Sequence, residues 1–213
     1  MDGNGRWAQS RNLPRTSGHL EGVKRVDELV DVANKRGIEA LTLYAFSTEN
    51  WSRPDQEVSM LMRTFIEAVK FKLKDIHQQG VRFRMLGRKK NVTKPVLSAF
   101  EHGEKLTENN TGMFLNIAFN YGSRLEILDA IQSIAADVKA GTCEPEDIDE
   151  KLVSDRLYTA GLPDPDLLIR TSGELRISNF LLWQLSYAEF YFTDKCWPEF
   201  TIEEFDKIGR AHV

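Results

Sequence analysis

The sequence predicts an α/β fold, a single domain whose mostly parallel central sheet is flanked by helices. Segments with apolar residues at helical spacing alternate along the chain with short apolar segments, and several helical segments end at a glycine. A nearly continuous apolar segment is typical of a strand buried on both faces of a parallel sheet. With 213 residues, 41% of them hydrophobic, the chain is long enough to bury one core.

The elements are expected in a regular order. Helical spacing predicts a first helix from Leu20 to a stop at Gly37, and the apolar segment IEALTLYAFS predicts a strand after it. The later predictions are a long helix over 55–80, a strand over 81–86, a helix over 94–107, a strand over 113–120, a helix over 123–141 and a short strand over 166–169. This alternation favours helices on both faces of the sheet, with ligands beyond the carboxyl ends of the strands.

Composition excludes several classes of function. A net charge of -4 argues against general nucleic-acid binding, and the two cysteines, Cys143 and Cys196, lack partners at metal-ligand spacing. We interpret them as small apolar residues in a reducing cytosol. No window approaches about eighteen apolar residues and no signal-peptide pattern is present, so any membrane contact is expected to be peripheral.

Polar segments follow the predicted strands. STENWSRP, NYGSR and RTSGELRIS each come after an apolar segment, and the opening DGNGRW would fit the same position. Because parallel strands end at one edge of a sheet, we expect these four turns to converge.

Three segments carry groups suited to phosphate. Glycines in DGNGR let backbone N–H groups approach an anion, while Arg6, Arg15, Arg170 and Arg176 offer bidentate hydrogen bonds. A single arginine more often forms a solvated surface pair, and only the clustering favours the phosphate interpretation. The P-loop and dinucleotide motifs are both absent, which disfavours an ordinary ATPase or dehydrogenase.

Two acidic residues are candidate metal ligands. Asp2 lies among the glycines and Arg6, where it would hold Mg2+ against a diphosphate or, equally well, cap a turn. Glu189 has aromatic and apolar neighbours, which predicts a paired or metal-bound carboxylate. His19 would cap a helix, contact an anion or serve structure alone. The remaining histidines, to which we assign no role, are His77, His102 and His212.

Five segments together resemble one family. MDGNGRWA, RTSGH, LTLYAFSTENWSRP, NIAFNYGSR and LLIRTSGELRISNFLLWQLSYAEFYFTDKCWP closely resemble the cis-prenyltransferases, most nearly the bacterial undecaprenyl diphosphate synthases. The resemblance extends from Met1 to about Asp206 in the order and spacing of the family. It implies the cis-prenyltransferase fold.

The resemblance also implies roles for individual residues. Asp2 matches the catalytic aspartate that engages Mg2+ and diphosphate, and Asn50 matches a residue assigned to proton removal. Because a neutral amide is a poor base, we expect Asn50 to position the acceptor. The matches around the allylic diphosphate are Gly3, Asn4, Gly5, Arg6, Trp7, Arg15 and His19. Further substrate contacts match Ser47, Thr48, Glu49, Trp51 and Arg53. The isopentenyl diphosphate site matches Arg170, Arg176, Ile177 and Ser178, and the metal-site glutamate matches Glu189.

The implied reaction adds isopentenyl diphosphate to an allylic diphosphate such as farnesyl diphosphate, with Mg2+ as cofactor. The resemblance also implies a homodimer, a cytoplasmic active site at the inner face of the membrane, and release of a polyprenyl product for cell-wall lipid carrier synthesis. It places an apolar tunnel near Met62, Phe65, Ile66, Val69 and Leu115, although core packing is the more common reason for such apolar stripes. We expect Met113 near the floor of that tunnel.

Both ends depart from the family pattern. The family has a short strand directly before the aspartate motif, whereas this chain starts within that motif. We expect a domain over 1–207 that is truncated at both ends, and a non-native tail over 208–213. A non-catalytic partner subunit and a simple anion-binding protein are the alternatives, and the first usually lacks the aspartate or arginines kept here. The all-helical trans-prenyltransferases are excluded because their D-D-x-x-D motifs are missing.

Overall fold

Two parallel sheets form the centre of the computed structural model, which describes residues 1–211. The larger sheet contains β1 (Ala40–Ser47), β3 (Phe114–Tyr121) and β2 (Arg82–Leu86), with β3 in the middle. The smaller sheet pairs β4 (Leu167–Arg170) with β5 (Glu189–Phe192). The predicted parallel strands are confirmed, but they are divided between two sheets.

The strands of the larger sheet end at one edge. Leu86 lies opposite Ala118 near the end of β2, and Ser47 lies opposite Tyr121 at the end of β1. The register of β1 shifts after Tyr44, which bends the strand just before the polar turn that follows it. The carboxyl ends therefore place the STENW and NYGSR turns side by side, as predicted.

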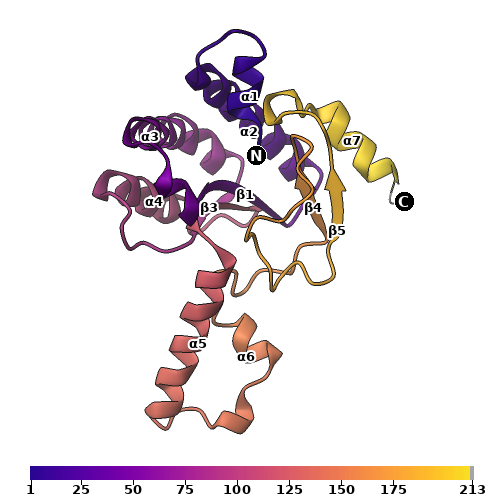
Figure 1. Cartoon of the computed structure of the whole chain (residues 1–213). Coiled ribbons are helices and arrows are strands. Elements are labelled where there is room, and N and C mark those ends of the chain that lie inside the picture. Colours follow the sequence, from indigo (N-terminus) through magenta and orange to yellow (C-terminus); the bar gives the residue numbers. More distant parts are fainter. Residues whose placement is uncertain (212–213) are drawn as a thin grey trace.

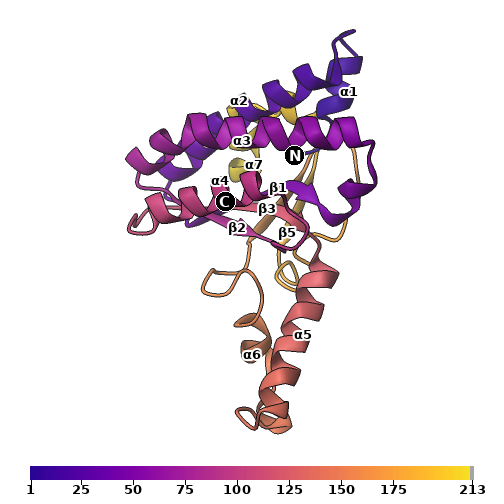
Figure 2. The same cartoon turned by 90° about the vertical axis from the view of Figure 1, so that its left-hand side faces the viewer.

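Three long helices cover one face of the larger sheet (Figures 1 and 2). They are α2 (Arg15–Lys35), α3 (Asp55–Gln78) and α4 (Lys94–Thr107). The main core lies between them and the sheet, and it includes Met62 on α3 and Leu115 on β3. The boundaries of α3 and α4 agree with the predicted helices, and Gly37 and Gly80, both at φ +73°, follow α2 and α3 as stops.

The other face of the sheet packs differently from the prediction. Its second core joins Ala118 and Tyr121 to Phe180 and Leu181, which belong to the irregular segment 177–188. Positive φ angles at several residues of that segment prevent it from forming a regular helix. The prediction of helices on both faces of one sheet is therefore wrong for this side.

Both ends of the chain contain more helix than predicted. The short helix α1 (Asn4–Gln9) follows Gly3, and α2 begins directly after Pro14, so His19 lies in its second turn rather than at its start. The last helix, α7 (Ile202–Ala211), continues past Lys207 into the segment that we expected to be a non-native tail. Ile208 is 2% exposed in the main core. His212 and the end of the expected tail lie outside the described residues.

The helix α5 (Ser123–Lys139) leaves the body of the molecule together with α6 (Glu150–Ser154), and the two form an arm (Figure 1). Leu128 and Ile131 on α5 are 48% and 52% exposed. The remaining short elements are the 3-10 helices η1 (Thr48–Ser52), η2 (Pro145–Asp147) and η3 (Trp197–Glu199). Among residues 1–211, none of the helices has the length and apolar character needed to cross a membrane.

Candidate active site

Asp2 is attached to the carboxyl end of β4. Its backbone N–H donates to Thr171 Oγ1 at 3.0 Å, and the Thr171 hydroxyl lies 2.9 Å from the Asp2 carbonyl oxygen. Its carboxylate accepts hydrogen bonds from the Gly3 N–H at 2.8 Å and from Arg170 Nη2 at 3.1 Å. The DGNGR and RTSG segments therefore meet, as the sequence predicts.

These contacts keep the Asp2 carboxylate ionised. Burial alone would raise the pKa of Asp2, but the hydrogen bonds from Arg170 and from the Gly3 N–H oppose it and leave the pKa below its ordinary value. The side chain remains 41% exposed, so a ligand can reach it. An ionised, accessible carboxylate is the form that binds a divalent cation.

Arg170 connects Asp2 to the segment that follows β4. Its side chain is only 13% exposed, and Nη1 donates to Ser178 Oγ at 2.7 Å and to the carbonyl oxygen of Arg176. One guanidinium group thus fixes three of the predicted positions at once. The planar fork of arginine makes this arrangement possible, since lysine carries a single point charge.

Two further arginines lie around Glu174. Arg6, on α1, donates to the Ser172 carbonyl oxygen at 3.1 Å and pairs with Glu174 Oε1 at 2.9 Å. Arg176 pairs with the other oxygen of Glu174, and its side chain is 62% exposed. Glu174 was not predicted. Because a diphosphate also accepts bidentate bonds from arginine, it can take over the contacts that Glu174 makes.

The small residues near Asp2 allow a close backbone approach. A Cβ atom on Gly3, which has φ +91°, would lie 1.9 Å from Ser172 Oγ, and one on Gly5 would lie 2.9 Å from Arg15 Nε. Gly18 on α2 has no space for a side chain either, because its Cβ would lie 1.9 Å from the Asn4 carbonyl oxygen. The α1 helix is therefore seated directly on α2. The guanidinium carbon of Arg11 lies over the Trp7 ring, 4.6 Å from the centre of that ring.

A second basic group lies at the beginning of α2 and α3. Glu57 accepts a hydrogen bond from Arg53 at 3.0 Å and lies 3.7 Å from Arg15. His19 is nearby, and burial followed by the charge of Arg53 lowers its pKa. Its Nε2 is buried and has no hydrogen-bond partner among residues 1–211. Because buried polar atoms normally have a partner, this atom is a candidate contact for a bound ligand.

Residues of other turns hold the STENW turn in place. Asn50 Oδ1 accepts the Ser47 N–H at 3.1 Å in a capping box that closes η1. Trp51 Nε1 donates to Asn120 Oδ1 at 2.7 Å. The Thr48 hydroxyl donates to Glu49 at 3.2 Å. The amide of Asn50 is therefore engaged in positioning this turn.

Asn179 joins three of the four turns, although the sequence analysis did not single it out. Its Nδ2 donates to Glu49 Oε1 at 3.0 Å, its Oδ1 accepts the Arg124 N–H at 2.9 Å, and its carbonyl oxygen accepts the Ser123 N–H at 2.8 Å. The preceding Ile177 packs against the second core. The asparagine directly after RIS is a sequence feature that indicates a tight turn, because asparagine tolerates the φ of +60° found here.

Glu189 is not close to Asp2. It lies at the start of β5 opposite Leu167, whereas Arg170, which contacts Asp2, lies opposite Phe192. Three strand positions correspond to about 10 Å. Glu189 is also exposed rather than buried, so it does not carry the desolvation cost that its apolar neighbours suggested. Within this chain, the two carboxylates do not share one ion.

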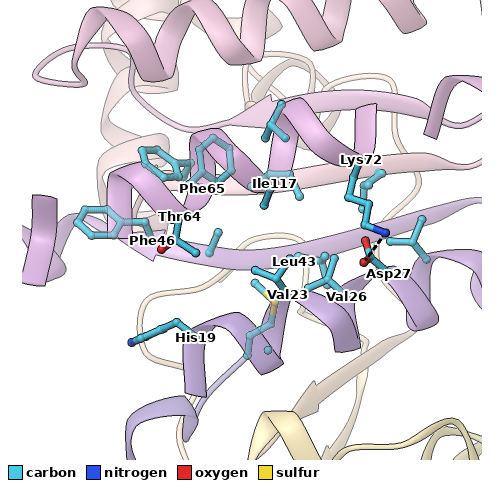
Figure 3. Close-up of a pocket in the computed structure, with 18 of the residues that line it drawn as sticks. His19, Val23, Val26, Asp27, Leu43, Phe46, Thr64, Phe65, Lys72 and Ile117 are labelled. Carbon is cyan, nitrogen blue, oxygen red and sulfur yellow. Dashed lines mark ion pairs between the residues drawn. The ribbon is translucent and has the colours of Figure 1, made fainter. Parts of the chain in front are cut away.

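An apolar cavity of about 230 Å³ extends from this site between α2, α3 and the larger sheet (Figure 3). Asn4 and His19 lie at the end near the arginines. The predicted lining residues Met62, Phe65, Val69 and Leu115 all line it. Ile66 and Met113 do not. Met113 is 3% exposed in the main core, so it does not form the floor of the cavity.

The comparison with known families agrees with this geometry. The family model described as "Putative undecaprenyl diphosphate synthase" matches residues 1–212. The chain belongs to the cis-prenyltransferase family. It is thus a prenyl-transferring enzyme, and the resemblance inferred from the motifs is confirmed.

Similar proteins of this family come from distant organisms. The chain is 50% identical to an isoprenyl transferase of Geobacillus kaustophilus, over 96% of this chain and 80% of that protein. It is 48% identical to a farnesyl-diphosphate-specific ditrans,polycis-undecaprenyl-diphosphate synthase of Vibrio cholerae, over 94% of this chain and 80% of that protein. Lavandulyl diphosphate synthase from Lavandula x intermedia, solved with dimethylallyl diphosphate, superposes with a TM-score of 0.95. The two chains are 37% identical, and the superposition covers 99% of this chain and 91% of the lavandulyl diphosphate synthase chain. The predicted fold class is confirmed.

The donor set at the site fits Mg2+ held jointly with a substrate. Among residues 1–211, no three acidic, histidine or cysteine side chains are grouped to form a complete metal site. Mg2+ commonly binds through one or two carboxylates together with substrate phosphate oxygens. The single ionised carboxylate of Asp2 beside Arg6 and Arg170 satisfies that requirement.

Proposed function

We propose that this cis-prenyltransferase adds isopentenyl diphosphate units to an allylic diphosphate and makes a long-chain polyprenyl diphosphate. We assign farnesyl diphosphate as the primer and undecaprenyl diphosphate, for the cell-wall lipid carrier, as the product. The junction of Asp2, Arg170 and Ser178 supports this proposal most strongly, together with the apolar cavity that Met1 and Asn4, on either side of Asp2 and Gly3, help to line. The site combines anion-binding groups with space for a prenyl chain.

The residues divide between the two substrates in this proposal. Gly3, Arg6 and the second basic group around Arg15 bind the allylic diphosphate, while Arg170, Arg176 and Ser178 bind isopentenyl diphosphate. The C1–O bond to the allylic diphosphate breaks, a carbon–carbon bond forms from the double bond of isopentenyl diphosphate, and the proton that isopentenyl diphosphate loses passes to an oxygen of the departing diphosphate. Arginines stabilise the charge that develops on the departing diphosphate, and fixed positions of both substrates lower the barrier further.

Asp2 is the residue that would hold Mg2+. The ion supplies charge neutralisation to the leaving diphosphate. Asp2 itself is oriented by Arg170 and by the Gly3 N–H, so its carboxylate faces the anion-binding groups without reorganisation. Within one chain, β5 places Glu189 at the other end of the smaller sheet from Asp2, so Asp2 alone is assigned to the ion here.

Asn50 acts through position rather than as a base in this proposal. Its amide oxygen accepts the Ser47 N–H, and an amide has negligible basicity. We expect Asn50→Ala to lose turnover while both substrates still bind, as measured by isothermal titration beside the product assay. Unchanged turnover would contradict this assignment.

The arm supports the proposal of a homodimer. Leu128 and Ile131 present exposed apolar side chains on α5, and Tyr187 is 99% exposed. Leu128 and Ile131 are three residues apart and therefore neighbours on the surface of α5, and a joined apolar surface is typical of a protein interface. Ile131→Glu is expected to yield monomers in sedimentation velocity, whereas the wild-type chain is expected to sediment as a dimer. We further propose a cytoplasmic enzyme that meets the membrane peripherally when it releases product.

The function is tested by incubating the chain with farnesyl diphosphate, labelled isopentenyl diphosphate and Mg2+, and separating the lipid products by length. Polyprenyl products that disappear when EDTA removes the cation are expected. Absence of label in the lipid fraction, with a folded chain by circular dichroism, would reject the proposal in favour of a non-catalytic partner subunit.

A further inference from the structure

An ion pair interrupts the apolar wall of the cavity. Asp27 on α2 and Lys72 on α3 face each other across the cavity, with Oδ2 and Nζ 2.9 Å apart (Figure 3). Both side chains line the cavity and are 30% and 29% exposed. Nearby lining residues such as Val26 and Val69 are apolar. A half-buried ion pair in such a wall invites a functional explanation, since the two charges give up much of their hydration there.

The pair lies away from the diphosphate site. Both helices begin at the arginine groups, and Asp27 is eight residues beyond His19 on α2, or about 12 Å along the helix axis. Ile76, Asp75 and Gln79 line the cavity beyond Lys72, within two further turns of α3. Asp75 and Gln79 are exposed, so this end of the cavity approaches solvent. The ion pair therefore separates the apolar length of the cavity from its outer end.

The surroundings make this pair sensitive to an apolar neighbour. Burial raises the pKa of Asp27, the contacts with Lys72 oppose that effect, and the negative charges of Asp75 and Glu28 add to it. A prenyl chain placed against the pair removes more of its water without offering a hydrogen bond. Growth past this point is therefore opposed, whereas growth along the apolar section is favoured by burial.

We infer that the Asp27–Lys72 ion pair limits product length by closing the outer end of the cavity to the growing prenyl chain. This inference rests on the proposed function, because it assumes a chain that elongates inside the cavity. It assigns a specificity-determining role to two residues that contact neither diphosphate nor Mg2+. The inference requires two opposite charges at these positions, but it does not depend on which of the two helices carries the negative charge.

Two double variants test the inference. Asp27→Asn/Lys72→Met preserves the approximate shape of both side chains and removes both charges. The reversed pair Asp27→Lys/Lys72→Asp retains the ion pair in the opposite direction. Each variant and the wild-type chain are given farnesyl diphosphate, labelled isopentenyl diphosphate and Mg2+, and the product lengths are compared. Thermal unfolding verifies that each variant is folded.

The neutral variant is expected to raise the fraction of products longer than the main wild-type product about tenfold, a factor that corresponds to ~1.4 kcal/mol. The reversed pair is expected to restore the wild-type lengths. The single change Asp27→Asn, which disturbs packing least, is expected to shift the lengths in the same direction as the neutral variant.

The outcomes separate this inference from the proposed function. If the wild-type chain incorporates isopentenyl units and the neutral variant gives the same product lengths, the inference alone is overturned. It is also overturned if the reversed pair makes the longer products, since packing rather than charge would then set the length. If the wild-type chain incorporates no isopentenyl units, the proposed function fails and this inference fails with it.

Discussion

Arg170 Nη2 donates a hydrogen bond to Asp2 Oδ2 at 3.1 Å, although 168 residues separate the two in the chain. The same guanidinium holds Ser178 through Nη1. The aspartate motif and the segment after β4 thus form one site only when the smaller sheet and the N-terminal turn are both in place. The geometry of the anion-binding groups depends on this contact.

Arg170→Lys is expected to raise the KM for isopentenyl diphosphate. A lysine cannot bond to Asp2 and Ser178 together, and loss of one charge-assisted hydrogen bond of ~1.5–3 kcal/mol corresponds to a factor of about 10–100. Initial rates over a range of isopentenyl diphosphate concentrations measure it. Arg63→Lys, at an exposed position on α3, is the matched control and should leave KM unchanged. Equal KM values for all three proteins would show that the fork of Arg170 is dispensable.

Asn179→Ala is expected to lower the free energy of unfolding by about 1–3 kcal/mol and to reduce turnover. The change removes the hydrogen bonds to Glu49 and to the Arg124 N–H, and it places alanine at a φ of +60°. Asn12→Ala is the matched control, because Asn12 has a φ of +54° and is exposed away from the turns. Urea unfolding measures the free energy of unfolding of both variants. If the two variants lose equal stability, backbone strain explains the effect and Asn179 does not join the turns.

Gly18→Ala is expected to displace α1 and reduce activity. The new methyl group would lie 1.9 Å from the Asn4 carbonyl oxygen, and overpacking of this kind typically costs about 1–3 kcal/mol. Movement of α1 also withdraws Arg6 from Ser172. Thr16→Ala, at an exposed position on α2, the helix that carries Gly18, should retain both stability and activity. A Gly18→Ala enzyme with normal kcat/KM would mean that the seat of α1 on α2 does not set the site.

His19 is expected to make the protein less stable as the pH falls. Its folded-state pKa lies below the ordinary value of 6.5, mainly because the side chain is buried. The unfolded chain therefore binds the proton first, so this residue subtracts stability as the pH drops through 6.5 toward the folded-state value. His19→Gln should flatten the decline of unfolding free energy between about pH 7 and pH 5. Urea titrations across that range measure the slope, and an unchanged slope would assign the decline to other groups.

Local patterns in the sequence predicted the long helices well. The apolar spacing of α3 and α4 and the glycine that follows α3 are properties of short segments, and tertiary contacts do not alter them. The short helix α1 was missed because it depends on Gly3 at φ +91° packed against Ser172, which is distant in sequence. The division into two sheets also depends on contacts between distant segments.

The arginines of the candidate site were predicted more completely than the side chains that pair with them. Motif arginines such as Arg170 were identified, whereas Glu57 and Glu174, which pair with arginines of the site, carry no pattern of their own. For Glu189 only the inferred burial differs from the structure. Its apolar neighbours suggested burial, but a position at the start of a two-stranded sheet can be exposed whatever its neighbours are.

The most direct test of the account is the initial rate at which Asp2→Asn transfers labelled isopentenyl diphosphate to farnesyl diphosphate at saturating Mg2+, relative to the wild-type chain. The amide retains the shape of Asp2 but has no charge for the cation. We predict a rate lower by about 10²–10³, the loss typical when one group that stabilises transition-state charge is removed. A rate for Asp2→Asn equal to that of the wild-type chain would contradict the assignment of the Asp2–Arg170 junction as the reactive centre.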